Sequence, residues 1–213
     1  MRTNHTLLAV DSAAADWGSR HASSLSERGL ELVTELGDTR AVVALAIVLV
    51  VVESLRAPSR FLVPFLITVM LGNELITTAV KDLADRARPT LNPIAHTLGP
   101  SFPSGHSSTA AAFFAAAALI LGRRRGHRAR TALVGGAVGV AVAVAVSRVL
   151  LDVHWASDVV AGLALGWAWF GVCAIAYGGR LLRFGAPAEA ARAAARDAPR
   201  AERRRGVGVG PRG

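Results

Sequence analysis

The chain has 213 residues, of which 52% are hydrophobic and only 18% are charged. This composition is too apolar for an ordinary soluble domain and is typical of a protein that crosses a membrane several times. The formal charge of +9 comes without interleaved basic and aromatic residues, so we expect no nucleic-acid partner. The single cysteine excludes a disulfide framework.

The first predicted element is an N-terminal segment over residues 1–36. Its apolar residues are interrupted by Asp11, Asp16 and Arg20, so it lacks the continuous apolar stretch of a signal peptide. We expect an interfacial, amphipathic helix in this segment, outside the membrane-spanning domain.

Five apolar runs follow within residues 37–182, and they predict one all-α domain, a polytopic bundle of transmembrane helices. The runs cover residues 41–52, 61–80, 103–121, 131–147 and 157–177. The first is shorter than the ~20 residues that a span requires. We therefore expect the charged ends of Arg40, Glu53 and Arg56 to reach the membrane surface.

The second run contains Asn73 and Glu74. An ionisable residue inside a span normally faces the bundle interior, so we expect this of Glu74. It precedes Lys81 by two helical turns and should lie on the same helix face.

Two pairs of glycines, each spaced four positions apart, occur in the fourth and fifth runs. They are Gly135 with Gly139, and Gly162 with Gly166. This spacing lets neighbouring helices approach closely, and we expect simple packing contacts at both pairs.

The arginines between the runs predict the orientation. The loop over 123–130 holds five, the turn over 56–60 holds two, and the tail over 183–213 holds eight. Short loops rich in arginine are typically cytoplasmic, which places the loops over 81–103 and 147–157 together on the extracytoplasmic side. The basic tail is poor in large apolar residues, and we expect it to be disordered.

The first polar cluster stands at the outer end of the second run and contains Lys81, Arg86 and Arg88. Lys81 is the only lysine among 24 basic residues. A phosphate with two charges needs several such donors to offset the loss of its water shell. Ordinary interfacial cations remain the alternative for this cluster alone.

The second cluster, Pro103-Ser104-Gly105-His106, immediately precedes the third run. It predicts a tight turn followed by a helix start, whose free amide groups bind anions. Ser104 adds a hydroxyl, and His106 can deliver a proton near neutral pH. A capped helix with an exposed histidine would look the same.

The third cluster contains Ser147, Arg148, His154 and Asp158. The last two are four positions apart, which places them on one helix face within reach of each other. A carboxylate bound to one ring nitrogen makes the other a better nucleophile. An ordinary surface pair is the alternative, whereas a metal site is disfavoured because the nearby acidic residues are scattered.

Together the three clusters resemble, in order and spacing, the signature of the type 2 phosphatidic acid phosphatase superfamily, over roughly residues 38–180. The resemblance implies that His154 is a nucleophile that forms a phosphohistidine, that Asp158 orients it, and that His106 protonates the leaving group. It also implies that fixed cations and amides hold the phosphoryl oxygens, with no metal and no cofactor. The implied phosphate-binding residues are Lys81, Arg88, Ser104, Gly105, Ser147 and Arg148.

Four positions near the clusters call for comment. Ala87 stands where the family often has proline, and Asp152 and Ala156 fall where glycine and proline are frequent. These positions vary in the family, but Asp152 adds a negative charge near an anion site and is a candidate for altering substrate choice. His96, in the loop before the second cluster, has no assigned role.

The sequence is therefore interpreted as a membrane-embedded hydrolase of lipid phosphates or lipid pyrophosphates at the extracytoplasmic face of a bacterial plasma membrane. Undecaprenyl or another polyprenyl pyrophosphate, phosphatidylglycerophosphate and phosphatidic acid all remain open as substrates, as does the oligomeric state. A lipid phosphotransferase using the same phosphohistidine is one alternative. A non-catalytic lipid-binding or transport protein is another, although it would not need His106, His154 and Asp158. Haloperoxidase activity is disfavoured because those relatives are soluble.

Overall fold

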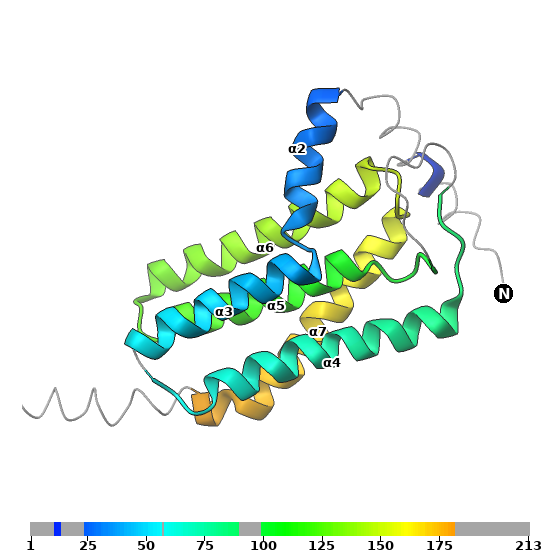
Figure 1. Ribbon diagram of the computed structural model, residues 1–213. Helices are drawn as coiled ribbons and strands as arrows, with labels where there is room; N and C mark the ends of the chain where they lie inside the picture. The colour runs from blue at the N-terminus through cyan, green and yellow to red at the C-terminus, as the bar shows by residue number, and fades with distance from the viewer. Residues whose placement is uncertain (1–10, 14–23, 57, 90–98, 182–213) are drawn as a thin grey trace, which may run out of the picture.

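A computed structural model describes residues 11–13, 24–56, 58–89 and 99–181, and these residues form an all-helical bundle (Figure 1). The helices, in chain order, are α2 (Ser24–Glu35), α3 (Thr39–Arg56), α4 (Leu62–Ala84), α5 (Gly105–Gly122), α6 (His127–Leu150) and α7 (Ala156–Leu181). The predicted all-α class is confirmed. The basic tail over 183–213 and His96 lie outside the described residues.

Four helices, α4 to α7, are long and apolar enough to cross a membrane. The fifth expected span corresponds to α3, whose 18 residues extend ~27 Å. The charged residues Arg40, Glu53 and Arg56 near its two ends leave α3 with a shorter apolar stretch than these four helices have. Its outward side nevertheless carries exposed Val43, Ile47 and Val51, and the helix lies along the others in the bundle (Figure 1).

Helix α5 forms the centre of the bundle. It contacts α3, α4, α6 and α7. Of the most apolar 18-residue stretch of α5, 56% is buried, against 22–28% of the corresponding stretch in α4, α6 and α7. The cause is its composition, because small side chains allow four neighbours to approach one helix. Its buried alanines are Ala110, Ala111, Ala112, Ala116 and Ala118.

The two glycine pairs behave differently. A methyl group on Gly162 or Gly166 would collide with the backbone of α5, at the carbonyl oxygens of Ser104 and Ser108 respectively. The predicted close approach is therefore confirmed for this pair. It is wrong for Gly135 and Gly139, since a methyl group on either would meet nothing within 4 Å among the described residues.

The polar residues of α4 also differ from the prediction, because Asn73 and not Glu74 faces the bundle interior. Asn73 is 2% exposed and accepts a 2.6 Å hydrogen bond from the Ser108 hydroxyl, which lies 3.2 Å from the Thr77 hydroxyl. Asn73 and Thr77 are one helical turn apart and occupy the inward face, so Glu74 points outward and is exposed.

Glu53 does not reach the membrane surface as predicted. Its carboxylate lies 3.1 Å from the Arg123 guanidinium, and the two side chains are 9% and 8% exposed. A buried carboxylate needs such a partner, and this ion pair joins the end of α3 to the end of α5. Arg40 and Arg56 are exposed, as expected.

The N-terminal helix α2 runs across the axis of the bundle and contacts α6 near one end (Figure 1). Its direction is the one expected of a helix that lies along a membrane surface, and Leu32 on its outer side is 74% exposed. The turn after α2 is tight, since a methyl group on Gly37 would meet both Val144 of α6 and His106 of α5.

Candidate active site

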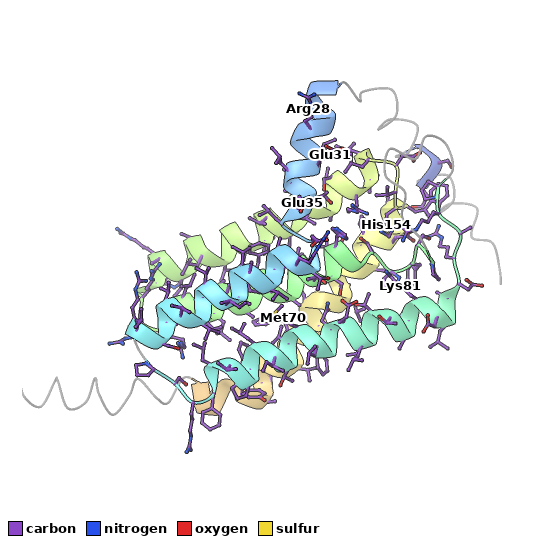
Figure 2. All side chains as sticks on the ribbon, viewed as in Figure 1. Arg28, Glu31, Glu35, Met70, Lys81 and His154 are labelled. Carbon is purple, nitrogen blue, oxygen red and sulfur yellow. The ribbon has the colours of Figure 1, made fainter. Side chains whose placement is uncertain are left out.

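The three polar clusters lie at the same end of the bundle. Lys81 is in the last turn of α4, the second cluster begins α5, Arg148 is in the last turn of α6, and His154 lies just before α7. Figure 2 shows Lys81 and His154 at this end, with Met70 about half-way along α4. A backbone hydrogen bond of 3.0 Å from Ser104 to the Asp158 carbonyl joins the starts of α5 and α7.

His154 is held between a carboxylate and a guanidinium. Its Nδ1 lies 3.5 Å from Asp158 Oδ2, and its Nε2 lies 3.4 Å from a terminal nitrogen of Arg88. The first distance is longer than an ordinary hydrogen bond, and such contacts in free enzymes often shorten when substrate binds. The arrangement leaves Nε2, on the cationic side, as the nitrogen able to attack an electrophile.

The protonation of His154 suits this role. Burial lowers the pKa of His154 below its ordinary value of 6.5, Asp158 acts in the opposite direction, and the charges of Arg148 and Arg88 lower the pKa further. The imidazole is therefore neutral at neutral pH. Only the neutral ring has the lone pair that a nucleophile requires.

Arg88 is fixed in place by the backbone. Its guanidinium donates to the carbonyl oxygens of Val153 at 2.9 Å, Gly99 at 3.0 Å and Pro100 at 3.3 Å. These bonds hold it beside His154 without neutralising its charge. A guanidinium anchored in this way is preorganised to bind an oxyanion.

Arg148 is 4% exposed, and one of its terminal nitrogens donates a 3.1 Å hydrogen bond to the Thr34 hydroxyl of α2. Its Nε has no hydrogen-bond partner among the described residues. Buried polar groups are nearly always hydrogen-bonded, and a buried charge in particular needs a counter-charge. This guanidinium is therefore well suited to receive an anion.

Lys81 stands over the start of α5, since a methyl group on Gly105 would lie 3.5 Å from its ammonium nitrogen. Ser104 is the N-cap of α5 and is fully buried, and its hydroxyl oxygen accepts a 3.0 Å hydrogen bond from the Ser107 hydroxyl. A helix N-terminus with a lysine above it favours an anion twice, through its amide groups and through the added charge.

His106 is half-buried in the first turn of α5. It lies within electrostatic range of His154 and of the charged groups Arg148, Lys81 and Asp38. The two histidines, the three cations and the helix start thus lie near one another at one end of the bundle. We call this group the phosphate cup, after the role that the sequence predicts for it. We define it by Lys81, Arg88, Ser104, Gly105, His106, Arg148 and His154.

Ser147 differs from the expectation that it would bind phosphate. It is fully buried, and its hydroxyl donates a 2.7 Å hydrogen bond to the Val144 carbonyl of the same helix. A hydroxyl has one proton to donate, so in this conformation Ser147 has none for a phosphate oxygen.

Arg86 also has a different role from the one its sequence position suggested. Its guanidinium lies 2.6 Å from Asp158 and 2.8 Å from Asp11, so it binds carboxylates and does not face the phosphate cup. Sequence reasoning missed Asp11 and Thr34 altogether. Neither belongs to a motif, and each reaches the site through a tertiary contact.

Asp152 occupies a left-handed backbone conformation with φ of 54° and is 3% exposed. This conformation explains why glycine is frequent at the position, because glycine adopts positive φ without steric strain. Aspartate is one of the few other residues that tolerate it.

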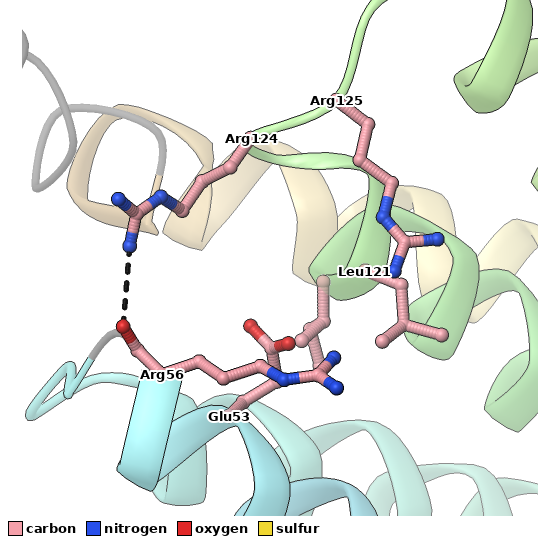
Figure 3. A pocket seen from close by; sticks show the side chains of 6 residues that line it. Glu53, Arg56, Leu121, Arg124 and Arg125 are labelled. Atoms are coloured by element: carbon pink, nitrogen blue, oxygen red, sulfur yellow. Dashed lines mark hydrogen bonds between the residues drawn. The ribbon is translucent and has the colours of Figure 1, made fainter.

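A separate pocket of about 330 Å³ lies at the opposite end of the bundle (Figure 3). It is lined by Glu53, Arg56, Ile120, Leu121, Arg124 and Arg125. Its lining includes arginines but no histidine, so it offers charge without a nucleophile. Among the described residues, no three His, Cys, Asp or Glu side chains gather as metal ligands.

Comparisons with known proteins agree with the geometry. A family model described as the PAP2 superfamily matches residues 62–181. A lipid A 1-phosphatase of Rhizobium etli is 31% identical over 71% of this chain and 71% of its own length. Phosphatidylglycerophosphatase B of Bacillus subtilis is 35% identical over 44% of this chain and 47% of its own length.

A similar solved structure is the transmembrane PAP2 type phosphatidylglycerolphosphate phosphatase from Bacillus subtilis. It has a TM-score of 0.76 and 26% identity, and the match covers 81% of this chain and 86% of that one. These matches confirm the resemblance that the three clusters indicated. The family match begins at residue 62, so Asp11, α2 and α3 lie outside it.

Proposed function

Because the chain belongs to the PAP2 superfamily, we propose that it is a membrane lipid phosphatase that acts through a phosphohistidine. The names of its relatives, a lipid A 1-phosphatase and a phosphatidylglycerophosphatase, support a lipid phosphate as the substrate. The observation that carries the proposal is a neutral His154 whose Nε2 lies 3.4 Å from Arg88. Nearby, the buried Arg148 has an Nε without a hydrogen-bond partner among the described residues.

In the first half-reaction, Lys81, Arg88, Arg148 and the amides at the start of α5 hold the non-bridging phosphoryl oxygens. His154 Nε2 attacks phosphorus, and the bond from phosphorus to the leaving oxygen breaks. For this step His106 must hold a proton, which it donates to that oxygen. The fixed donors stabilise the charge that spreads over the equatorial oxygens.

In the second half-reaction, water attacks the phosphorus of the phosphohistidine. His106, now neutral, takes a proton from that water, and the bond between phosphorus and His154 Nε2 breaks. Inorganic phosphate leaves, and both histidines return to their starting protonation states. Asp158 supports both steps because its negative charge stabilises the positive charge that the modified ring carries.

We place the cup at the extracytoplasmic face of a bacterial plasma membrane. Support comes from the other end of the bundle, where Arg124 and Arg125 are exposed in the loop that the positive-inside rule assigns to the cytoplasm. The lipid chains would then stay in the outer leaflet while the phosphate enters the cup. Polyprenyl pyrophosphates such as undecaprenyl pyrophosphate, phosphatidylglycerophosphate, phosphatidic acid and lipid A 1-phosphate are all substrates of this chemical class.

The deciding experiment measures free phosphate release by the purified full-length protein in the presence of a chelator, across these lipids. We expect the unmodified protein to release phosphate from at least one lipid and to yield an acid-labile phosphoenzyme. The variant His154→Ala should do neither, because loss of the nucleophile abolishes turnover. His127→Ala is the matched control, since His127 is exposed at the opposite end of the bundle.

Three results would contradict the proposal in different ways. Phosphate release that survives His154→Ala would refute the nucleophile, and release that requires added metal would refute metal independence. A phosphorylated second lipid with little free phosphate would indicate a phosphotransferase that uses the same site.

A further inference from the structure

Residue Asp11, which lies far outside the family match, is buried against the edge of the candidate active site. It is 2% exposed. Its Oδ2 accepts hydrogen bonds from Arg86 at 2.8 Å and from the Ser157 hydroxyl at 2.7 Å, and its Oδ1 accepts one from the Ser157 backbone amide at 2.9 Å. One carboxylate thus binds two segments that lie 75 and 146 positions away in the chain.

The contacts of Asp11 stop short of the phosphate cup and reach it through two intermediates, Arg86 and Asp158. Arg86 donates to Asp11 through one terminal nitrogen and to Asp158 Oδ1 through the other, at 2.6 Å. The second oxygen of Asp158 accepts a 3.0 Å hydrogen bond from the Trp155 amide and is the oxygen that faces His154 Nδ1. The order of contact is therefore Asp11, Arg86, Asp158 and His154.

Based on this geometry, we infer that Asp11 is a positioning residue that sets the orientation and the effective charge of the His154–Asp158 pair through Arg86. The inference deepens the proposed function and rests on it.

Two physical effects support the positioning role of Asp11. The first is orientation: Arg86 can present one edge to Asp158 Oδ1 because Asp11 holds the other edge, so Oδ2 stays aimed at the imidazole. The Ser157 contacts add to this, because Ser157 precedes Asp158 in the first turn of α7 and is bound by Asp11 through both its backbone and its hydroxyl. A planar guanidinium held on both edges has little freedom to rotate.

The second effect is electrostatic. Arg86 stands between two carboxylates, so its single positive charge is shared and does not fully neutralise Asp158. The Asp158 carboxylate therefore keeps negative charge with which to stabilise a positively charged His154 ring. Burial raises the pKa of Asp11, but hydrogen bonds from Arg86 and Ser157 outweigh this and leave it below its ordinary value, so Asp11 is ionised at neutral pH.

The test is Asp11→Asn in the full-length protein, compared with Asp85→Asn. Both variants remove one negative charge next to Arg86, but Asp85 is exposed, and asparagine tolerates its left-handed conformation, φ 39°. We expect Asp11→Asn to lower kcat roughly tenfold with KM nearly unchanged, an effect within the range of coupling energies between residues of one hydrogen-bond network. Asp85→Asn should leave both constants unchanged.

A double-mutant cycle with Arg86→Gln separates positioning from general structural support. If Asp11 acts mainly through Arg86, then Asp11→Asn has a much smaller effect on kcat once Arg86 is replaced, and only the direct Ser157 contacts contribute what is left. Thermal unfolding in the same detergent measures stability alongside activity. A loss of kcat that is fully additive with that of Arg86→Gln, or an Asp11→Asn variant with unchanged kcat, would overturn the inference.

The outcome is distinguishable from failure of the proposed function. Should Asp11→Asn behave like the unmodified protein while His154→Ala is inactive, the positioning role alone is refuted. Should His154→Ala retain activity, the proposed mechanism itself fails, whatever Asp11 does.

Discussion

At the scale of single residues, the chemistry of the site depends on how His154 is balanced between opposite charges. Burial lowers its pKa most, Asp158 raises it, and the charges of Arg148 and Arg88 lower it further. Cations that bind phosphate would, without a nearby carboxylate, make the imidazole a weaker nucleophile. Asp158 opposes this effect on the side of the ring that faces away from Arg88.

This balance predicts a specific dependence on pH. Because the pKa of His154 lies below 6.5, the attacking neutral form persists as pH falls and is lost only below that value. We expect the acid limb of kcat/KM, which reports the free enzyme, to lie below pH 6.5 for the unmodified protein. In Asp158→Asn the limb should move to still lower pH, and the rate at neutral pH should fall on the order of 10²- to 10⁴-fold.

The measurement is the pH profile of phosphate release with one lipid substrate, so that the ionisation of the substrate is common to all profiles. Asp82→Asn is the control, because Asp82 is exposed on α4 at the same end of the bundle. A limb that stays in place or rises in Asp158→Asn would contradict the assigned role of that carboxylate.

The residues of the phosphate cup could be predicted from sequence more fully than the residues that hold them in place. Lys81, Arg88, Arg148 and His154 belong to motifs with fixed spacing, and the structure brings them to one end of the bundle. Arg86 stands between Lys81 and Arg88 in the first motif, yet its partners are determined by tertiary contacts. Thr34, for example, reaches Arg148 across 114 positions of sequence, and no local pattern encodes such a contact.

At the scale of helices, the site depends on how closely α7 approaches α5. Gly162 and Gly166 lie against the α5 backbone, and the hydrogen bond from Ser104 to the Asp158 carbonyl joins the two helix starts. Glycine spacing predicted this contact correctly on α7 and wrongly on α6. A small-residue pair permits close packing, but which helix faces it depends on the assembled bundle.

The glycine pairs therefore predict opposite results for the same substitution. Gly166→Ala places a methyl group against the Ser108 carbonyl, and we expect it to destabilise the protein by about 1–3 kcal/mol. It should also lower activity, since it displaces α5 relative to α7. The methyl group of Gly139→Ala meets no atom within 4 Å in the part of the chain that the structure describes, so this variant should be neutral or stabilising by up to ~1 kcal/mol.

Thermal unfolding and phosphate release, measured in one detergent for both variants, test this pair of predictions. Equal stability of the two variants would show that α5 and α7 are not packed as closely as described here.

At the scale of the whole molecule, the end that holds the phosphate cup and the arginine-rich end are separated by the length of the bundle. The distribution of arginines predicted that all three polar clusters would share one side, and the structure places them at one end. The number of spans was less predictable. Helix α3 is short and carries charges at both ends, and one of these, Glu53, is buried by a partner on another helix.

The proposed orientation can be tested by labelling introduced cysteines with a membrane-impermeant maleimide. The natural Cys173 is buried and is replaced by alanine first. We expect Asp82→Cys, at the end that holds the phosphate cup, to react in intact cells. Arg125→Cys, at the other end, should react only after the membrane is permeabilised, and the reverse pattern would place the phosphate cup in the cytoplasm.

The hydrogen bond that joins the starts of α5 and α7 has a consequence for biogenesis. Until the ribosome reaches α7, the nascent chain holds Lys81, Arg88, Arg148 and His154 but lacks Asp158, whose backbone binds Ser104 and whose side chain faces His154. In the proposed mechanism, hydrolytic competence therefore arises only once α7 has been made. A polypeptide stalled or truncated before α7 would be catalytically silent, so turnover reports on chains that have completed their assembly.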